Sequence, residues 1–358
     1  MYLCGIGYGG SFHLWQHDSL ANRWYPVKFL SGHFDTVEDV AYDMDDGGYV
    51  VTVSHDQTCR IFAPTYPTNP SPSYPCTSPS TSPSTSHTYH EVSRPQIHGY
   101  DLNCVVLSYG HGDADGHTHS HTKLHTYSIL TGGEEKVIRV FEMPKIVYDG
   151  LHTLCHIPLH THTPSIHQAY IPELGLSNKG RELATQQEVK DLLARGVSDI
   201  DWGVLPLESQ LADFTLWVEV EKLYGHHNDV LCMGMSYDGV HMVSSSKARY
   251  GQDSTALLLL WRIKSSHAHT PSHTPSSDLT HTNTHIPSPV HTSYEVVQAL
   301  PGNTSTVVCL QFSRHNQYLV TGSKDRKLCV YVYDAHTQVY ELVLVVSSAH
   351  KRIIWDLW

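Results

Sequence analysis

The chain has 358 residues, enough to bury a large core or to form more than one domain. Its formal net charge is −12, from 23 Lys and Arg against 35 Asp and Glu, which excludes attraction of the whole chain to nucleic acid but leaves room for a local basic face. The 8 cysteines occur singly and the N-terminal residues do not resemble a signal peptide, so we predict a reducing compartment, the cytoplasm with the nucleus as a second site. No apolar run is long enough to span a bilayer, and we expect no membrane contact.

The first residues resemble the end of a repeat whose earlier strands are missing. The strand-like SFHLW ends on Trp15, and Gly9 stands where a turn acid would be expected. At the other end, His350 opens a repeat that does not finish. We therefore expect the chain to be a fragment of a longer protein.

Residues 31–62 carry the clearest repeat. A Gly-His pair ending at His33 is followed by an alternating apolar run, an Asp- and Gly-rich turn and a second β-rich run. Asp56 then occupies a tight turn, and Phe62 follows six residues later. Alternation broken by Asp/Gly turns predicts short antiparallel strands. The Gly-His start and the Asp-turn-aromatic end are typical of a four-stranded blade of a WD40 β-propeller.

In such a blade the opening His, a Ser or Thr of the second strand, the turn Asp and the closing Trp can hydrogen-bond in series. Buried polar groups need such partners, and a satisfied network selects one arrangement. For this blade we predict His33, Thr52 or Ser54, and Asp56, with Phe62 unable to donate the final bond. A catalytic base with its orienting acid is the alternative, and it is disfavoured because the Asp recurs in another repeat.

Later blades repeat the pattern with substitutions. One runs from about 94 to 141, with Glu135 at the turn-acid position, and another opens at His226. The last full blade has Gly302-Asn303 where Gly-His is expected. The predicted network residues of the whole chain are Trp15, His33, Thr52, Ser54, Asp56, His226, Trp261 and Asp325.

Four stretches rich in His, Ser, Thr and Pro interrupt the blades. They have little to bury, so we predict disordered inserts at about 64–90, 110–126, 146–169 and 264–293. Many of the 29 histidines lie there, and His117, His119, His121 and His125 could in principle bind zinc or nickel. Because the His-Thr pattern has no Cys or carboxylate partners, we predict no physiological metal site. The apolar stripe of residues 181–196 predicts a helix.

No catalytic motif is present. The chain lacks a phosphate loop, a Gly-x-Ser-x-Gly elbow and a His-Glu-x-x-His helix, so we predict no enzyme activity, no cofactor and no small-molecule substrate. Four basic residues near strand ends could contact an acidic partner or RNA, although solvated surface charge is the simpler interpretation. They are Lys324, Arg326, Lys351 and Arg352.

Several segments resemble the family of second subunits of the Elongator complex. They include RPQIHGYDLNC from Arg94, LGLSNK at 174–179, the stretch from Thr215 to His226, and the terminal AHKRIIWDLW. RPQIHGYDL and LGLSNK are not required by a blade, so they carry most of the specificity.

The resemblance implies an all-β chain holding parts of two tandem WD40 propellers. Residues 1–205 would be the last blades of the first propeller and 206–358 the opening blades of the second. It also implies a non-catalytic scaffold that binds the large scaffold subunit and the catalytic acetyltransferase subunit of a complex that modifies wobble uridines of tRNA. Contact with tRNA would be indirect. A WD40 adaptor of a ubiquitin ligase or vesicle coat is the alternative, and a metal-handling protein built on the His inserts is a third hypothesis.

Overall fold

The computed structural model describes most of the strand-forming parts of the chain. The described residues are 1–6, 12–28, 31–43, 48–66, 88–97, 99–109, 127–157, 164, 166–172, 175, 177–181, 200–248, 258–264 and 293–357. The helix predicted at 181–196, the histidines at 117–125 and most of the inserts at about 64–90, 110–126 and 264–293 lie outside them.

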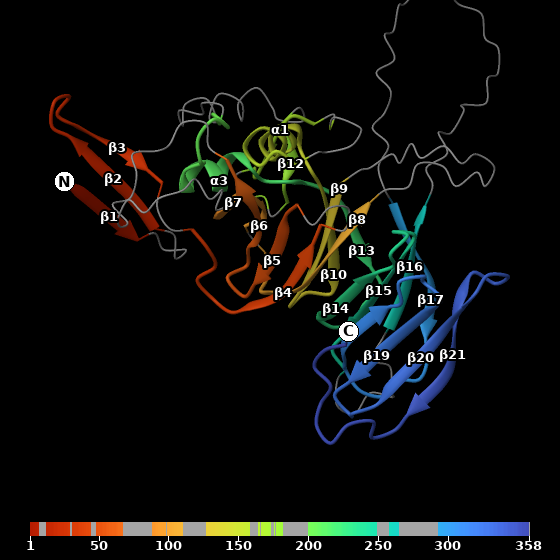
Figure 1. Ribbon diagram of the computed structural model, residues 1–358. Coiled ribbons are helices and arrows are strands. Elements are labelled where there is room, and N and C mark those ends of the chain that lie inside the picture. The colour runs from red at the N-terminus through yellow and green to blue at the C-terminus, as the bar shows by residue number, and fades with distance from the viewer. Residues whose placement is uncertain are drawn as a thin grey trace, which may run out of the picture.

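Most described residues in regular structure belong to antiparallel sheets (Figure 1). A three-stranded sheet is formed by β1 (Tyr2–Ile6), β2 (Phe12–Asp18) and β3 (Arg23–Val27). The first four-stranded sheet is formed by β4 (Val37–Tyr42), β5 (Val50–Ser54), β6 (Cys59–Thr65) and β7 (Thr88–Gln96). The second is formed by β8 (Leu102–Tyr109), β9 (Tyr127–Gly133), β10 (Val137–Glu142) and β13 (Val218–Tyr224).

Two further four-stranded sheets follow in the C-terminal part of the chain. The third is formed by β14 (Val230–Met235), β15 (His241–Ser246), β16 (Leu258–Lys264) and β17 (Ser293–Leu300). The fourth is formed by β18 (Val307–Phe312), β19 (Tyr318–Ser323), β20 (Leu328–Asp334) and β21 (Val339–Val346). A small ladder joins β11 (Ala169–Tyr170) to β12 (Lys179–Gly180). The predicted all-β class and the four-stranded propeller blades are thus confirmed.

The first strands of the four blades, β4, β8, β14 and β18, lie next to one another in chain order. Each carries a β-bulge close to its start, which raises the local twist. Side chains beside these bulges reach the next blade. The Asp39 carboxylate accepts a hydrogen bond of 2.9 Å from the Val105 N–H, and the Cys232 thiol donates to the Val307 carbonyl oxygen at 3.7 Å. The bulged strands therefore join the four blades into one arc.

The arc crosses the predicted domain boundary between residues 205 and 206. Strand β13, which lies after that boundary, pairs with β10, which lies before it. The Asn103 amide also donates to the Val230 carbonyl oxygen at 2.9 Å, which ties the second blade to the third. This boundary therefore does not coincide with a break between sheets, because the second blade takes its outer strand from a distant segment. The division into two propellers stays a prediction.

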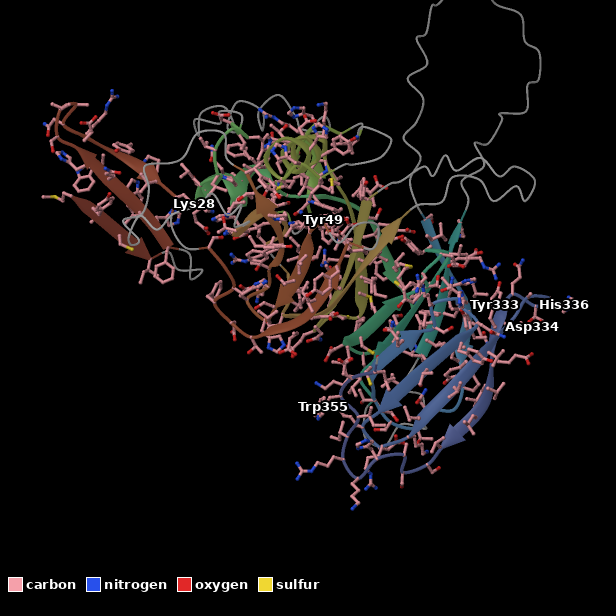
Figure 2. All side chains as sticks on the ribbon, in the orientation of Figure 1. Lys28, Tyr49, Tyr333, Asp334, His336 and Trp355 are labelled. Carbon is pink, nitrogen blue, oxygen red and sulfur yellow. The ribbon has the colours of Figure 1, made fainter. Side chains whose placement is uncertain are left out.

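A helix occupies the start of the insert predicted at 146–169. Helix α1 (Lys145–Leu154) buries Ile146, Val147, Leu151 and Leu154. These side chains share one core with the first blade, where Tyr49 is 1% exposed (Figure 2). The prediction of an insert was wrong for the residues of α1. Their apolar positions recur on one helical face, and the surrounding His-rich sequence obscures that pattern.

A second helix, α3 (Glu208–Phe214), packs close to β7. It buries Leu211 and Phe214. Among the described residues, neither helix has the length and hydrophobicity that crossing a bilayer requires.

Candidate functional site: blade networks and an outer-strand junction

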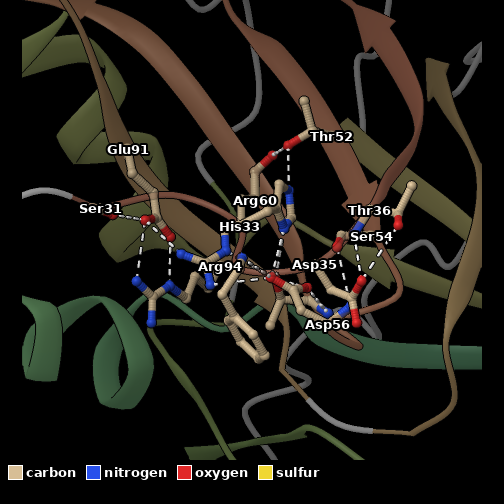
Figure 3. A network of polar contacts seen from close by, with 12 residues as sticks. Ser31, His33, Asp35, Thr36, Thr52, Ser54, Asp56, Arg60, Glu91 and Arg94 are labelled. Atoms are coloured by element: carbon tan, nitrogen blue, oxygen red, sulfur yellow. Dashed lines mark hydrogen bonds and ion pairs between the residues drawn. The ribbon is translucent and has the colours of Figure 1, made fainter. Parts of the chain in front are cut away.

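The predicted network residues of the first blade are in contact (Figure 3). His33 Nδ1 lies 2.9 Å from Asp56 Oδ2, and His33 Nε2 lies 2.7 Å from Thr52 Oγ1. Ser54 Oγ accepts the backbone N–H of Asp56 at 3.0 Å. Thr58, which the sequence analysis missed, donates its hydroxyl to Asp56 Oδ1 at 2.6 Å. The tight turn after β5 positions this carboxylate under the opening histidine.

Asp56 is held ionised by these neighbours. Burial opposes ionisation, but the hydrogen bonds from His33 and Thr58, together with the Arg60 charge, lower the pKa of Asp56 to about 2. The folded pKa lies below the unfolded value, so the stabilisation is complete above about pH 4 and is lost as the pH falls towards 2.

Substituting Asp56→Asn should therefore flatten the acid limb of the stability curve. We expect the variant to lose about 2 kcal/mol less unfolding free energy than the parent protein when the pH falls from about 4 to about 2. Urea unfolding at a series of pH values measures this. An unchanged acid limb in the variant would contradict the network assigned to Asp56.

The third blade contains the same series with a tryptophan at its end. Ser244 Oγ lies 2.6 Å from His226 Nε2 and accepts the Trp261 indole N–H at 2.7 Å. Ser244 Oγ therefore links the opening histidine to the closing tryptophan. Burial, with a smaller effect of His227, lowers the pKa of His226 to about 4. Ser244 was missed from the sequence, although it lies 18 residues after His226 much as Thr52 lies 19 after His33.

His226 should make the protein less stable in mild acid. Its folded pKa lies below the unfolded value, so unfolding takes up a proton as the pH falls from about 6.5 to about 4. We expect this histidine alone to lower the unfolding free energy by about 3 kcal/mol over that range. His226→Gln should remove that part of the pH dependence. Equal slopes for both proteins in denaturant titrations would show that His226 is not the group responsible.

In the fourth blade an asparagine replaces the opening histidine. Asn303 Nδ2 donates to Thr321 Oγ1 at 3.2 Å and to the Tyr331 hydroxyl at 2.9 Å. Asp325 instead accepts from the Thr304 hydroxyl at 2.8 Å and pairs with Lys327 at 3.5 Å. Asn303 departs from the repeat in sequence, yet it bonds Thr321 as His33 bonds Thr52, while the turn acid Asp325 bonds elsewhere.

Trp15 lies apart from these networks. It belongs to β2 in the three-stranded sheet, where its ring stacks on His13 with centroids 5.8 Å apart. The structure therefore places it with an aromatic neighbour instead of an opening histidine and serine.

Buried ion pairs recur in the first two blades. The closing aromatics Phe62 and Phe141 pair with Glu91 and Glu219 of the outer strands. In each blade an arginine two residues before the aromatic reaches that glutamate. Arg60 Nη1 lies 3.1 Å from Glu91 Oε2, and Arg139 Nη1 lies 3.0 Å from Glu219 Oε2. The repeated Arg-x-Phe sequence is the signal that could have revealed these pairs.

RPQIHGYDL, LGLSNK and the stretch that begins at Thr215 meet at one buried junction. The Asn178 amide, from LGLSNK, donates to the carbonyl oxygens of Pro95 at 2.7 Å and Trp217 at 2.8 Å. The Trp217 backbone N–H also donates to Pro95 at 3.2 Å, and its indole N–H donates to Ser93 Oγ at 3.1 Å. Trp217 is 0% exposed. Asn178 and Trp217 thus join β7, the outer strand of the first blade, to the start of β13, the outer strand of the second.

Arg94 links this junction to α3. Its guanidinium pairs with Glu91 in the same strand and with Glu208 at 2.6 Å. Burial disfavours the charged form, but the two carboxylates outweigh it and raise the pKa of Arg94. Burial likewise opposes ionisation of Glu208, but the hydrogen bond from Arg94 and the charge of Arg94 lower the pKa of Glu208. These charges hold strands and helix together.

The four basic residues named above lie on neighbouring loops. Lys324, Arg326, Lys351 and Arg352 are exposed, and the Ala349 N–H donates to the Arg326 carbonyl oxygen at 3.0 Å. This bond joins the two segments that carry them, and Asp325 lies between Lys324 and Arg326 in the sequence. Within the described parts of the chain, no group of three or more His, Cys, Asp or Glu is arranged to hold a metal ion.

Comparison with known proteins agrees with this architecture. The family model described as "WD domain, G-beta repeat" matches residues 24–62, 217–258 and 294–332. Elongator complex protein 2 of Rattus norvegicus is 29% identical over 372 residues, which covers 97% of this chain and 38% of that protein. The chain thus carries WD repeats and is similar to Elongator complex protein 2 over nearly its whole length.

Similarity to Elongator complex protein 2 extends from animals to yeast. Elongator complex protein 2 of Homo sapiens is 27% identical over 97% of the chain, and that of Saccharomyces cerevisiae is 29% identical over 91%. The chain spans 38% and 35% of these two relatives. The aligned region is long enough to include both the blades and the outer-strand junction.

Proposed function

We propose that the chain is part of a non-catalytic WD40 scaffold subunit of the Elongator complex. It holds the large scaffold subunit and the catalytic acetyltransferase subunit, and so supports wobble-uridine modification of tRNA, in the cytoplasm with the nucleus as a second site. Contact with tRNA is indirect. The similarity to Elongator complex protein 2 over 97% of the chain carries this proposal. The junction of Pro95, Asn178 and Trp217 supports it, because the segments that resemble that family meet there.

A structural role for the polar networks supports a scaffold. The His33 and Asp56 arrangement has counterparts at His226 and Asn303 in other blades, whereas an active site would need one unique copy. Each group is bonded to its neighbours and contributes to a fixed blade. Changes at His33 or Asp56 should lower stability and assembly without removing any intrinsic turnover.

The test is affinity purification of the full-length native protein from its own cells, followed by mass spectrometry. Recovery of the large and the catalytic Elongator subunits in comparable amounts supports the proposal. Recovery of ubiquitin-ligase or vesicle-coat components in their place would overturn it and would favour a different WD40 adaptor. The same peptides would show whether the His-rich inserts are translated.

A further inference from the structure

The second and third blades lie side by side and share an apolar core (Figure 1). Tyr294 of β17 reaches this core from the third blade. The second blade contributes a row of apolar side chains across β8, β9 and β10: Val106, Leu130 and Val140. Two residues further along each strand, the next row is polar and consists of Ser108, Ser128 and Glu142. Because residues i and i+2 of a strand share a face, the polar row also faces the third blade.

Three buried hydroxyl groups at this polar row have no hydrogen-bond partner among the described residues. They belong to Ser108, Ser128 and Tyr294, which are 1%, 2% and 5% exposed. Ser108 and Ser128 are opposite each other in the ladder between β8 and β9. Buried polar groups are normally paired, so a cluster of three such hydroxyls is a set of oxygen atoms that can hold a ligand.

The contact between the third and fourth blades has the same plan, but there the tyrosine is satisfied. Tyr340 is the equivalent of Tyr294, because each pairs with the residue two places after the closing aromatic of its blade. The Tyr340 hydroxyl donates to the Asn316 carbonyl oxygen at 2.6 Å, and its ring lies 6.1 Å from that of His241. His241 is the equivalent of Ser128, since each pairs with the residue directly after the closing aromatic. The second blade therefore presents a small hydroxyl side chain where the third presents a ring.

Two carboxylates lie near the three hydroxyls. Glu142 completes the polar row, and Glu221 of β13 accepts the Ser293 hydroxyl at 3.1 Å and the Tyr294 N–H at 3.3 Å. Burial raises the pKa of Tyr294, the nearby Ser108 hydroxyl opposes this rise, and the charges of Glu221 and Glu142 add to it. Both carboxylates are therefore within electrostatic reach of the tyrosine hydroxyl. The two groups that donate to Glu221 are neutral, so they leave its negative charge in place.

We propose that this set of three hydroxyls and two carboxylates binds a hard divalent cation, Ca²⁺ or Mg²⁺, between the second and third blades. Every donor is an oxygen atom, the ligand that both ions prefer, and the set has none of the imidazole or thiolate groups that favour zinc or copper. The two carboxylates match the charge of the ion. Because β8, β9, β10 and β13 of the second blade and β17 of the third all contribute, the ion joins the two blades. The inference does not depend on the proposed function.

Titration of the full-length protein with CaCl₂ or MgCl₂ tests the site. The protein is first dialysed against EDTA and then against metal-free buffer. Isothermal titration calorimetry should show a single ion bound per chain for at least one of the two salts, and the same salt should raise the melting temperature. The salt that binds more tightly identifies the ion. If neither salt binds, the three hydroxyls serve no cation and the inference fails.

A double variant separates ion binding from folding. Ser108→Ala combined with Ser128→Ala should weaken ion binding by at least about tenfold, because two ligands are lost. In EDTA the melting temperature of this variant should be no lower than that of the parent, because the removed hydroxyls have no partner in the metal-free protein. Tyr294→Phe keeps the ring and should show the same loss of affinity. Equal affinities in the parent and in both variants would place the ion elsewhere and overturn the inference.

Ser236→Ala is the matched control. Ser236 is 1% exposed in the third blade, and its hydroxyl donates to Asp238 at 2.5 Å. This variant should melt at a lower temperature in EDTA but bind the ion as tightly as the parent. A loss of affinity in Ser236→Ala equal to that in the double variant would show that the effect comes from general destabilisation, which would contradict the assigned site.

Discussion

Replacing Trp217 by alanine is expected to lower the free energy of unfolding by about 3–5 kcal/mol. The indole is 0% exposed, packs in the core that the first blade shares with α1, and donates to Ser93 Oγ at 3.1 Å. Truncation leaves a large cavity and removes the indole donor to Ser93. Urea unfolding monitored by circular dichroism measures the change.

Trp24→Ala is the matched control. Trp24 is 42% exposed in β3 and its ring lies 5.0 Å from that of His17. Removing it should cost less than about 1 kcal/mol, since exposed side chains contribute little. Similar losses for the two variants would mean that the junction around Trp217 does not hold the blades together.

Replacing Arg94 by methionine should be comparably destabilising, by about 3–5 kcal/mol. The substitution keeps much of the side-chain volume but leaves Glu91 and Glu208 without their shared cation. Glu91 is 0% exposed at its side chain and Glu208 is 11% exposed, so water compensates poorly. Equilibrium unfolding of the full chain at pH 7 measures the loss.

The exposed pair of Lys145 and Asp149 provides the comparison for Arg94. Its atoms lie 2.6 Å apart, but the side chains are 40% and 42% exposed. Lys145→Met should therefore change the free energy of unfolding by less than about 1 kcal/mol. A loss at Arg94 no larger than that at Lys145 would show that the buried charges are not a structural link.

The local pattern predicted the blades well and their connections poorly. His33, Asp56 and Phe62 identify a blade because turn chemistry and alternation act over a few residues. The same reasoning missed α1, where histidines obscure an apolar helical face. It also missed the buried ion pairs: the repeated Arg-x-Phe sequence points to Arg60 and Arg139, but the carboxylates opposite them are distant in the sequence.

The sequence by itself determined the four-stranded repeat and singled out RPQIHGYDL and LGLSNK, which contain Pro95 and Asn178, as not required by it. Only the tertiary structure decided that these segments meet, because the contacting residues Ser93 and Trp217 are 124 residues apart in the sequence. It also decided that β13 completes the second blade across the predicted boundary. The physical reason is that alternation and turns depend on neighbouring residues, whereas an outer edge accepts any segment with suitable backbone donors and buried side chains.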